Sequence, residues 1–176
     1  MRLVTIVLVL LALSSCGRTY SDLESAFRTD TISKESPLSA RTIVLTSRLH
    51  RGAESYHGLA TIRLSADSVD IDMSMPFKKP IRIPTDQIAG CSMTCFGTDD
   101  QHVDLLVPKV EVDIMIPSSE ELLNWCWSSK RPMFPSSVRR AWQYKGSPLP
   151  PASDFKEQLD SRQSFDKQKT QSCLGY

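Results

Sequence analysis

The pattern that decides the fold lies at residues 68–75, Ser68-Val69-Asp70-Ile71-Asp72-Met73-Ser74-Met75. Apolar and polar side chains alternate along it without interruption. Strict alternation is typical of an antiparallel strand with one face in the core and the other in water. Pro76 ends the pattern, because proline cannot donate a hydrogen bond to a neighbouring strand. The segment therefore predicts a half-buried antiparallel strand.

The same alternation recurs on both sides of this segment. The run at 79–84 lies between Pro80 and Pro84, which favours an edge strand. His50, Arg51 and the loop to Tyr56, between the first two strands, are expected to form a solvated turn. The expected strands, about seven in all, are residues 41–47, 58–65, 68–75, 79–84, 87–96, 103–107 and 110–116. The chain is expected to be mainly β.

A helix is expected directly after the last of these strands. Ser118, with Glu121 three residues later, matches a capping box, in which each side chain accepts an amide hydrogen at the helix start. One face of this helix would be apolar, and its residues are Leu122, Leu123, Cys126 and Trp127. Prolines then recur through 130–152, which predicts an irregular strap. A short helix is expected at 153–170, with Ser153 as its cap and Phe155 and Leu159 facing inward.

This order of strands followed by a capped helix resembles the pleckstrin-homology-like superfold over roughly residues 40–129. The segment 76–84, Pro-Phe-Lys-Lys-Pro-Ile-Arg-Ile-Pro, and Asp86-Gln87-Ile88 after it are similar to a stretch of bacterial members and of GRAM-type domains. The resemblance implies two bent antiparallel sheets in a partly open barrel, closed at one end by the amphipathic helix. A different small barrel or sandwich with an added helix would give nearly the same pattern. The superfold serves mostly as a binding scaffold.

The N-terminus has the pattern expected of an export signal. Arg2 precedes an apolar run from Leu3 to Leu13, which is too short for a hydrocarbon core that needs roughly 20 residues. The run ends in Leu13-Ser14-Ser15-Cys16, which resembles the bacterial lipobox. The resemblance implies diacylglycerol on the Cys16 thiol, cleavage just before it, and acylation of the new amine with a fatty acid such as palmitate. The alternatives are an ordinary signal peptide with an incidental Cys16, or a buried apolar strand.

Gly17 follows the cysteine, where an aspartate would favour retention at the inner membrane. The lipobox resemblance thus implies attachment to the outer membrane, facing the periplasm. Four segments follow from these patterns: a signal peptide at 1–15, a lipidated N-terminus and flexible tether at 16–39, the barrel-like domain with its helix at 40–129, and the strap with a short helix at 130–176. The chain is long enough for one domain with a core.

Charge and motifs narrow the class of function. The chain of 176 residues has 21 Lys and Arg against 20 Asp and Glu. This balance argues against a nucleic-acid partner, which needs a basic face. The three histidines, His50, His57 and His102, stand in no recognisable catalytic or metal motif, and the sequence has no phosphate-binding glycine loop. We expect no enzyme activity, no catalytic residue and no cofactor.

Four cysteines follow Cys16, namely Cys91, Cys95, Cys126 and Cys173. In an oxidising compartment an even number indicates two disulfides, with three possible connectivities. On one regular strand Cys91 and Cys95 would lie about 13 Å apart, whereas a disulfide joins Cα atoms within about 7 Å. Pairing of both with Cys126 and Cys173 is therefore preferred, unless a turn interrupts 91–95 and restores the local pair.

A soft-metal site is the alternative for this segment. Two thiolates and a thioether, from Cys91, Cys95 and Met93, would suit Cu(I), and zinc bound by all four cysteines is formally possible. The second hypothesis for the protein is thus a copper-binding or copper-carrying lipoprotein.

Aromatic and basic residues gather after the expected barrel. They are Trp125, Trp127, Arg131, Arg139, Arg140, Trp142, Tyr144 and Lys145. Rings beside cations suit a membrane interface or a partner surface, and Arg131, Arg139, Arg140, Trp142 and Tyr144 are the candidates for that contact. The alternative is that the tryptophans pack on the core while the arginines are solvated or paired. The first hypothesis for function is a non-catalytic binding or assembly module, which meets another envelope protein through a sheet edge or residues 130–145.

Overall fold

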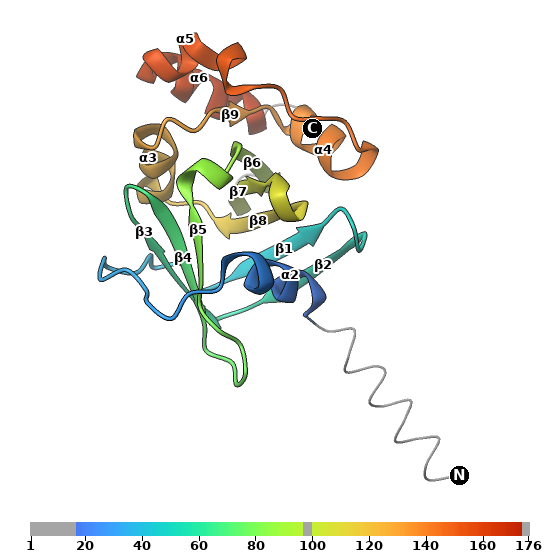
Figure 1. Cartoon of the computed structure of the whole chain (residues 1–176). Coiled ribbons are helices and arrows are strands. Elements are labelled where there is room, and N and C mark those ends of the chain that lie inside the picture. Colours follow the sequence, from blue (N-terminus) through green and yellow to red (C-terminus); the bar gives the residue numbers. More distant parts are fainter. Residues whose placement is uncertain (1–16, 97–99, 174–176) are drawn as a thin grey trace.

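The computed structural model describes residues 17–96 and 100–173. Its described part is mainly β and has two sheets, with strand orders β2-β1-β8-β7-β6-β9 and β3-β4-β5 (Figure 1). All pairs are antiparallel except β6 with β9. The strands are β1 (Ile43–Ser47), β2 (Gly52–Tyr56), β3 (Ala60–Leu64), β4 (Ser68–Met73), β5 (Ile81–Pro84), β6 (Gly90–Phe96), β7 (Asp100–Val107), β8 (Val112–Pro117) and β9 (Met133–Phe134). The helices are α2 (Arg18–Phe27), α3 (Glu120–Ser128), α4 (Ser136–Lys145), α5 (Lys156–Asp160) and α6 (Arg162–Cys173), with 3₁₀ turns η1 (Thr85–Gln87), η2 (Pro108–Val110) and η3 (Ala152–Phe155).

Each of the expected strand segments contains a strand, but the sheets are not closed into a barrel. The strands β3, β4 and β5 form a separate sheet with its own edges. The strands β2 and β9 were not expected from the sequence. The solvated turn predicted from His50 to Tyr56 was wrong for residues 52–56, which form β2. This edge strand is largely exposed and shows no apolar alternation.

The core lies between the two sheets and is formed by the apolar positions of the alternating patterns. In β4, Val69, Ile71 and Met73 are buried, as the pattern predicts. The polar Asp70 is also buried, and its carboxylate accepts two hydrogen bonds from Arg82 on β5, at 2.8 and 2.7 Å. Burial alone would raise the pKa of Asp70, but these bonds and the Ser33 backbone N–H hold it below its ordinary value.

The tether predicted at 16–39 was wrong for its central part, because residues 18–27 form α2. Tyr20, Leu23 and Phe27 have helical spacing on one face, and all three are buried in the core. The helix start is capped from another element: Glu54 on β2 accepts hydrogen bonds from the backbone N–H groups of Thr19, at 2.9 Å, and Tyr20, at 3.3 Å. A carboxylate at this position neutralises the unpaired amides and the positive end of the helix dipole.

The helix α3 begins one residue later than the capping box predicted. Ser119, not Ser118, is its N-cap, and its hydroxyl accepts the Leu122 backbone N–H at 3.2 Å. The buried face consists of Leu122, Trp125 and Cys126, while Trp127 is half-buried. The predicted face was thus right for two of these positions and missed Trp125.

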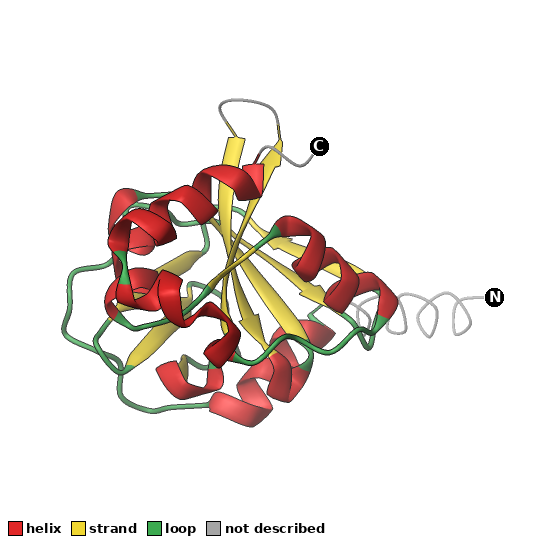
Figure 2. Ribbon diagram, turned by 90° about the horizontal axis from the view of Figure 1, so that it is seen from above, coloured by secondary structure: helices red, strands yellow, loops and turns green. Residues whose placement is uncertain are grey.

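The prediction of an irregular strap at 130–152 was wrong, because this stretch contains β9 and α4. Pro135 directly precedes α4, where its missing N–H costs no helix hydrogen bond, and Gly146 ends the helix with a φ of 72°. The short helix expected at 153–170 is η3, α5 and α6, whose buried residues include Gln158 and Phe165 rather than Leu159. Seen from above in Figure 2, these C-terminal helices lie in front of the strands.

Candidate functional site

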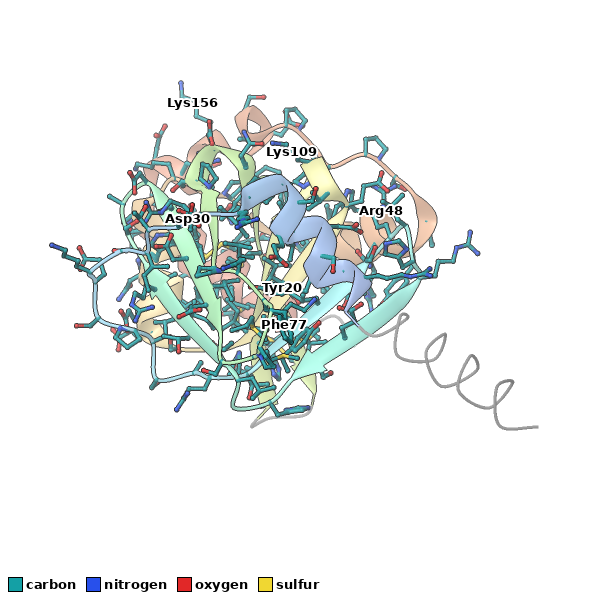
Figure 3. The ribbon with its side chains drawn as sticks, turned by 60° about the horizontal axis from the view of Figure 1, so that its bottom comes forward. Tyr20, Asp30, Arg48, Phe77, Lys109 and Lys156 are labelled. Atoms are coloured by element: carbon teal, nitrogen blue, oxygen red, sulfur yellow. A yellow bond between two sulfur atoms is a disulfide. The ribbon has the colours of Figure 1, made fainter. Side chains whose placement is uncertain are left out.

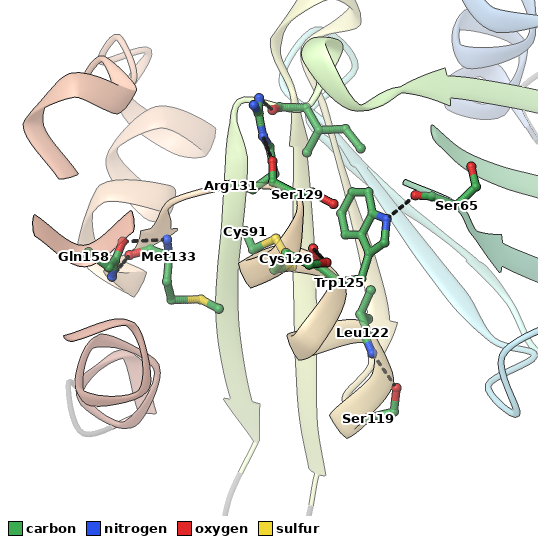
Figure 4. The surroundings of a disulfide bond; sticks show 12 residues. Ser65, Cys91, Ser119, Leu122, Trp125, Cys126, Ser129, Arg131, Met133 and Gln158 are labelled. Carbon is green, nitrogen blue, oxygen red and sulfur yellow. Dashed lines mark hydrogen bonds between the residues drawn. A yellow bond between two sulfur atoms is a disulfide. The ribbon is translucent and has the colours of Figure 1, made fainter. Parts of the chain in front are cut away.

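Two disulfides join β6 to helices that follow it in the chain. Cys91 pairs with Cys126 on α3, with the Cα atoms 6.4 Å apart, and Cys95 pairs with Cys173 on α6, at 5.6 Å. The predicted cross-pairing is confirmed. Figure 4 shows the Cys91–Cys126 bridge beside Trp125, whose indole N–H donates to the backbone oxygen of Ser65 at 2.6 Å. The bridge and this hydrogen bond together fix α3 against both sheets.

The two cysteines of the proposed copper site, Cys91 and Cys95, are both oxidised to disulfides. Cys91 and Cys95 have no thiolate while bridged, and Met93 between them is buried in the core. Over residues 17–96 and 100–173 no three His, Cys, Asp or Glu side chains are grouped as a metal site would need. Copper binding at Cys91, Met93 and Cys95 would require reduction of both bridges.

The predicted contact residues separate into three groups. Trp142 and Arg139 are only 2% and 5% exposed, so they are not surface contacts. The alternative is confirmed for both, because Trp142 packs in a core cluster and Arg139 is paired with two aspartates. Helical geometry explains this, because positions 139 and 142 face the sheet while Arg140 and Tyr144 lie on the side of α4 in contact with solvent. Arg131 lies elsewhere, with its guanidinium bonded to the backbone oxygens of Ile88 and Ser129.

A groove of about 670 Å³ lies between α4 and the face of the large sheet that is turned away from the core. We call it the α4 groove. Three of the predicted contact residues, Arg139, Arg140 and Tyr144, lie along it. Its remaining lining comes from the sheet and the strand edges: Thr42, Val44, Thr46, Ala53, His57, Thr94, His102, Met115 and Pro117. Tyr144 is 71% exposed, which is unusual for a large aromatic side chain.

The α4 groove continues into a second, more basic hollow of about 570 Å³. Thr46, Ala53 and Tyr144 belong to both. The second hollow adds cationic side chains from the β1–β2 turn and the end of α4, namely Arg48, Arg51 and Lys145, with Glu111 as the acid among them. In the combined surface, apolar and hydroxyl side chains of the sheet lie between cationic side chains on both sides.

The strand β2 forms the edge of the large sheet beside this groove. The Arg48 backbone N–H donates to Glu111 O next to β8, at 3.0 Å. Backbone N–H and C=O groups alternate in direction along a strand, so those of Leu45 and Ser47 point the other way from Arg48, toward β2. Their partners there are Glu54 and Gly52. Ala53 and Ser55 therefore direct their N–H and C=O groups away from β1. Both side chains are small and exposed, so this backbone is accessible.

The other sheet edges are covered by the chain itself. At β9, the Met133 N–H donates to the Gln158 side chain at 3.0 Å, and Ser172 donates to Phe134 O at 3.4 Å. The edge of β5 meets Arg28 in an isolated bridge, and the edge of β3 meets Pro37 in another. Covering of this kind prevents association through strand edges. Within residues 17–96 and 100–173, the exposed edge at β2 is the exception to this covering.

A buried ionic cluster lies beneath the α4 groove. The Arg139 guanidinium is 2.6 Å from Asp113 on β8 and 3.3 Å from Asp104 on β7, and Thr94 donates a hydrogen bond to Asp104 at 2.7 Å. Both carboxylates are fully buried. The cluster joins α4 to β7 and β8.

Signals in the sequence could have identified only part of this site. The exposed Tyr144 and Arg140 come from the predicted aromatic and basic stretch. The edge strand β2 has no apolar alternation, so the sequence pattern gave no sign of it. The lipobox residues and Cys16 lie outside the described residues. Within the described ranges, no helix has both the length and the apolar character needed to cross a bilayer. No family model matches the chain, and no curated protein matches it in sequence.

Proposed function

We propose that the protein is a lipid-anchored, non-catalytic binding module of the bacterial cell envelope, which holds an extended peptide segment of another envelope protein along β2 and in the α4 groove. The lipobox-like Leu13-Ser14-Ser15-Cys16 supports the anchor, and Gly17 supports an outer-membrane position facing the periplasm. Two disulfides fit an oxidising compartment of this kind.

The observation that carries the binding role is the accessible backbone of Ala53 and Ser55 beside an open groove. An extended peptide can add to such an edge as a further strand, with main-chain hydrogen bonds giving affinity and side-chain pockets giving specificity. Alternate side chains of the added strand would point toward the groove face, where Thr46 and Val44 offer small hydroxyl and apolar contacts.

The chemistry of the surroundings indicates the character of that peptide. Arg51, Arg140 and Lys145 lie around the combined groove, whereas Arg48 is paired with Glu111 at 3.6 Å. Acidic side chains in the partner segment would therefore be favoured. Tyr144 would act as an aromatic contact, since a large exposed ring gains most by being covered.

The pleckstrin-homology-like fold is retained as a proposal. It is supported by the position of α3, which follows β8 directly and packs its apolar face into the core. Such folds commonly serve as binding scaffolds, which agrees with the role proposed for β2 and α4.

A photo-crosslinking amino acid in place of Tyr144 tests the binding role in intact cells. We expect a discrete crosslinked species in the membrane fraction, with mass spectrometry locating the junction in an extended acidic segment of the partner. The matched control is the same substitution at Lys156, which is exposed on α5 and outside the groove. Equal crosslinking patterns at the two positions, or none at position 144, would refute the binding role.

A further inference from the structure

The connection between β4 and β5, residues 74–80, has an unusual apolar tip. Phe77 is 97% exposed and has a φ of 66°, in the left-handed region that a bulky side chain rarely adopts. Exposure of a whole phenylalanine to water is unfavourable, and so is this backbone conformation. Neither feature is explained by contacts within the molecule.

The tip is held firmly against the start of α2. The buried Tyr20 donates its hydroxyl hydrogen to Lys79 O at 2.8 Å, and the Lys79 N–H donates to the Glu24 carboxylate at 3.2 Å. The Lys78 ammonium lies 3.5 Å from Gly17 O and 5.1 Å from the centre of the Tyr20 ring. These contacts fix the backbone directly after Phe77, so its ring projects from a supported position.

The charges at this end of the molecule favour an anionic surface. Arg18 and Lys79 are exposed. The nearby acids Glu24 and Glu54 are used within the protein, since Glu24 accepts the Lys79 N–H and Glu54 caps α2. An exposed ring flanked by cations is the combination that favours the interface of a bilayer with anionic headgroups.

The position of Gly17 connects this tip to the proposed anchor. Cys16 directly precedes Gly17 in the chain, and consecutive Cα atoms lie about 3.8 Å apart. Gly17 O is itself within reach of Lys78, so the lipid would leave the chain beside the tip. Figure 3 places the labels of Tyr20 and Phe77 next to each other. Figure 1 shows α4 at the opposite end of the molecule from this connection.

We propose that residues 74–80 form a membrane-contact tip, in which Phe77 enters the headgroup region of the bilayer that holds the lipid while Arg18 and Lys79 meet anionic phosphates. This inference rests on the lipid anchor of the proposed function. Because acyl chains dominate membrane affinity, the tip fixes the orientation of the domain rather than its binding strength. That orientation would present α4 and its groove toward the periplasm.

The experiment uses the full-length protein, processed in cells and purified with its lipid, in vesicles of phosphatidylethanolamine and phosphatidylglycerol. Phe77→Trp adds a fluorophore at the tip, and its emission is measured as the difference from the unsubstituted protein. We expect a blue shift and loss of emission when the phospholipids carry brominated acyl chains. The matched control is Leu49→Trp in the β1–β2 turn, where the native leucine is also exposed, at 62%. This variant is expected to show neither change.

The outcomes separate the tip from the anchor. Intact mass and flotation report acylation and membrane attachment independently of the fluorescence. An acylated protein that floats, with no bromolipid quenching at position 77, would overturn the tip and leave the anchor standing. A protein without acylation would remove the anchor and the tip together, while leaving the crosslinking test of the α4 groove unaffected. Quenching at both positions 77 and 49 would also overturn the defined orientation.

Discussion

Arg139 of α4 lies between two buried aspartates, 2.6 Å from Asp113 and 3.3 Å from Asp104, and so joins the helix to two neighbouring strands of the large sheet. One cation therefore faces two carboxylates. Burial raises the pKa of Asp104 from its ordinary 3.8 to about 7, with repulsion from Asp113 adding to the effect and Arg139 opposing it. Burial also raises the pKa of Asp113. The cluster therefore takes up a proton near neutral pH.

Proton binding by Asp104 in the folded state predicts that stability depends on pH. Between pH about 4 and 7 the folded protein keeps a proton on Asp104 that the unfolded chain releases near its ordinary pKa of 3.8. The folded state then binds more protons, so the free energy of unfolding should fall as the pH rises through this window. Urea unfolding of the wild type and of Asp104→Asn, followed across the window, measures the effect. Parallel curves for the two proteins would contradict the assignment.

Replacement of Arg139 should be strongly destabilising. Arg139→Met keeps much of the side-chain volume but leaves two buried carboxylates without a cation, which costs roughly 3 to 5 kcal/mol. The matched control is Arg140→Met, because Arg140 is exposed on the next position of the same helix and should change stability by less than about 0.5 kcal/mol. Thermal and chemical unfolding of both variants give the comparison. A similar loss in the two would show that the cluster contributes little.

Each disulfide should contribute substantially to stability. The sequence separations of 35 and 78 residues close long loops, for which removal costs about 2 to 5 kcal/mol. Paired substitutions to alanine, Cys91→Ala with Cys126→Ala and Cys95→Ala with Cys173→Ala, should each lower the urea midpoint of unfolding. Thiol counting in denaturant on the protein from the periplasm should find no free thiol, whereas four free thiols would end the disulfide assignment and revive the soft-metal hypothesis.

The parts of the fold that the sequence predicted share one property, a contrast between buried and exposed faces. The alternation of Val69, Ile71 and Met73 records such a contrast. The preference for cross-pairing of Cys91 and Cys95 came instead from the length that a regular strand spans between them. The strand β2 has no such contrast, because only Tyr56 at its end is buried. The helix α4 was missed because the frequent prolines predicted an irregular strap. Pro135, however, directly precedes a helix, a position that proline favours.

The site was only partly predictable for a related reason. The charge of Arg139 suggested exposure, because the sequence could not show that Asp104 and Asp113 project from two strands toward the same point. Conversely, the exposed position of Phe77 was not predicted, because the proximity of Lys78 to Gly17 depends on how α2 packs against β5.

Blocking the outer edge of β2 should abolish partner binding without unfolding the domain. The Ser55 N–H points away from β1, so Ser55→Pro removes an outward donor and breaks no hydrogen bond of the sheet. The matched control is Ser55→Ala, which keeps the N–H and changes only the side chain. With a photo-crosslinking amino acid at position 144, we expect the crosslinked species to disappear in Ser55→Pro and to persist in Ser55→Ala, at similar melting temperatures. If the proline variant crosslinks as well as the alanine variant, then the partner does not add to β2, and the contact is confined to side chains of α4 and the groove.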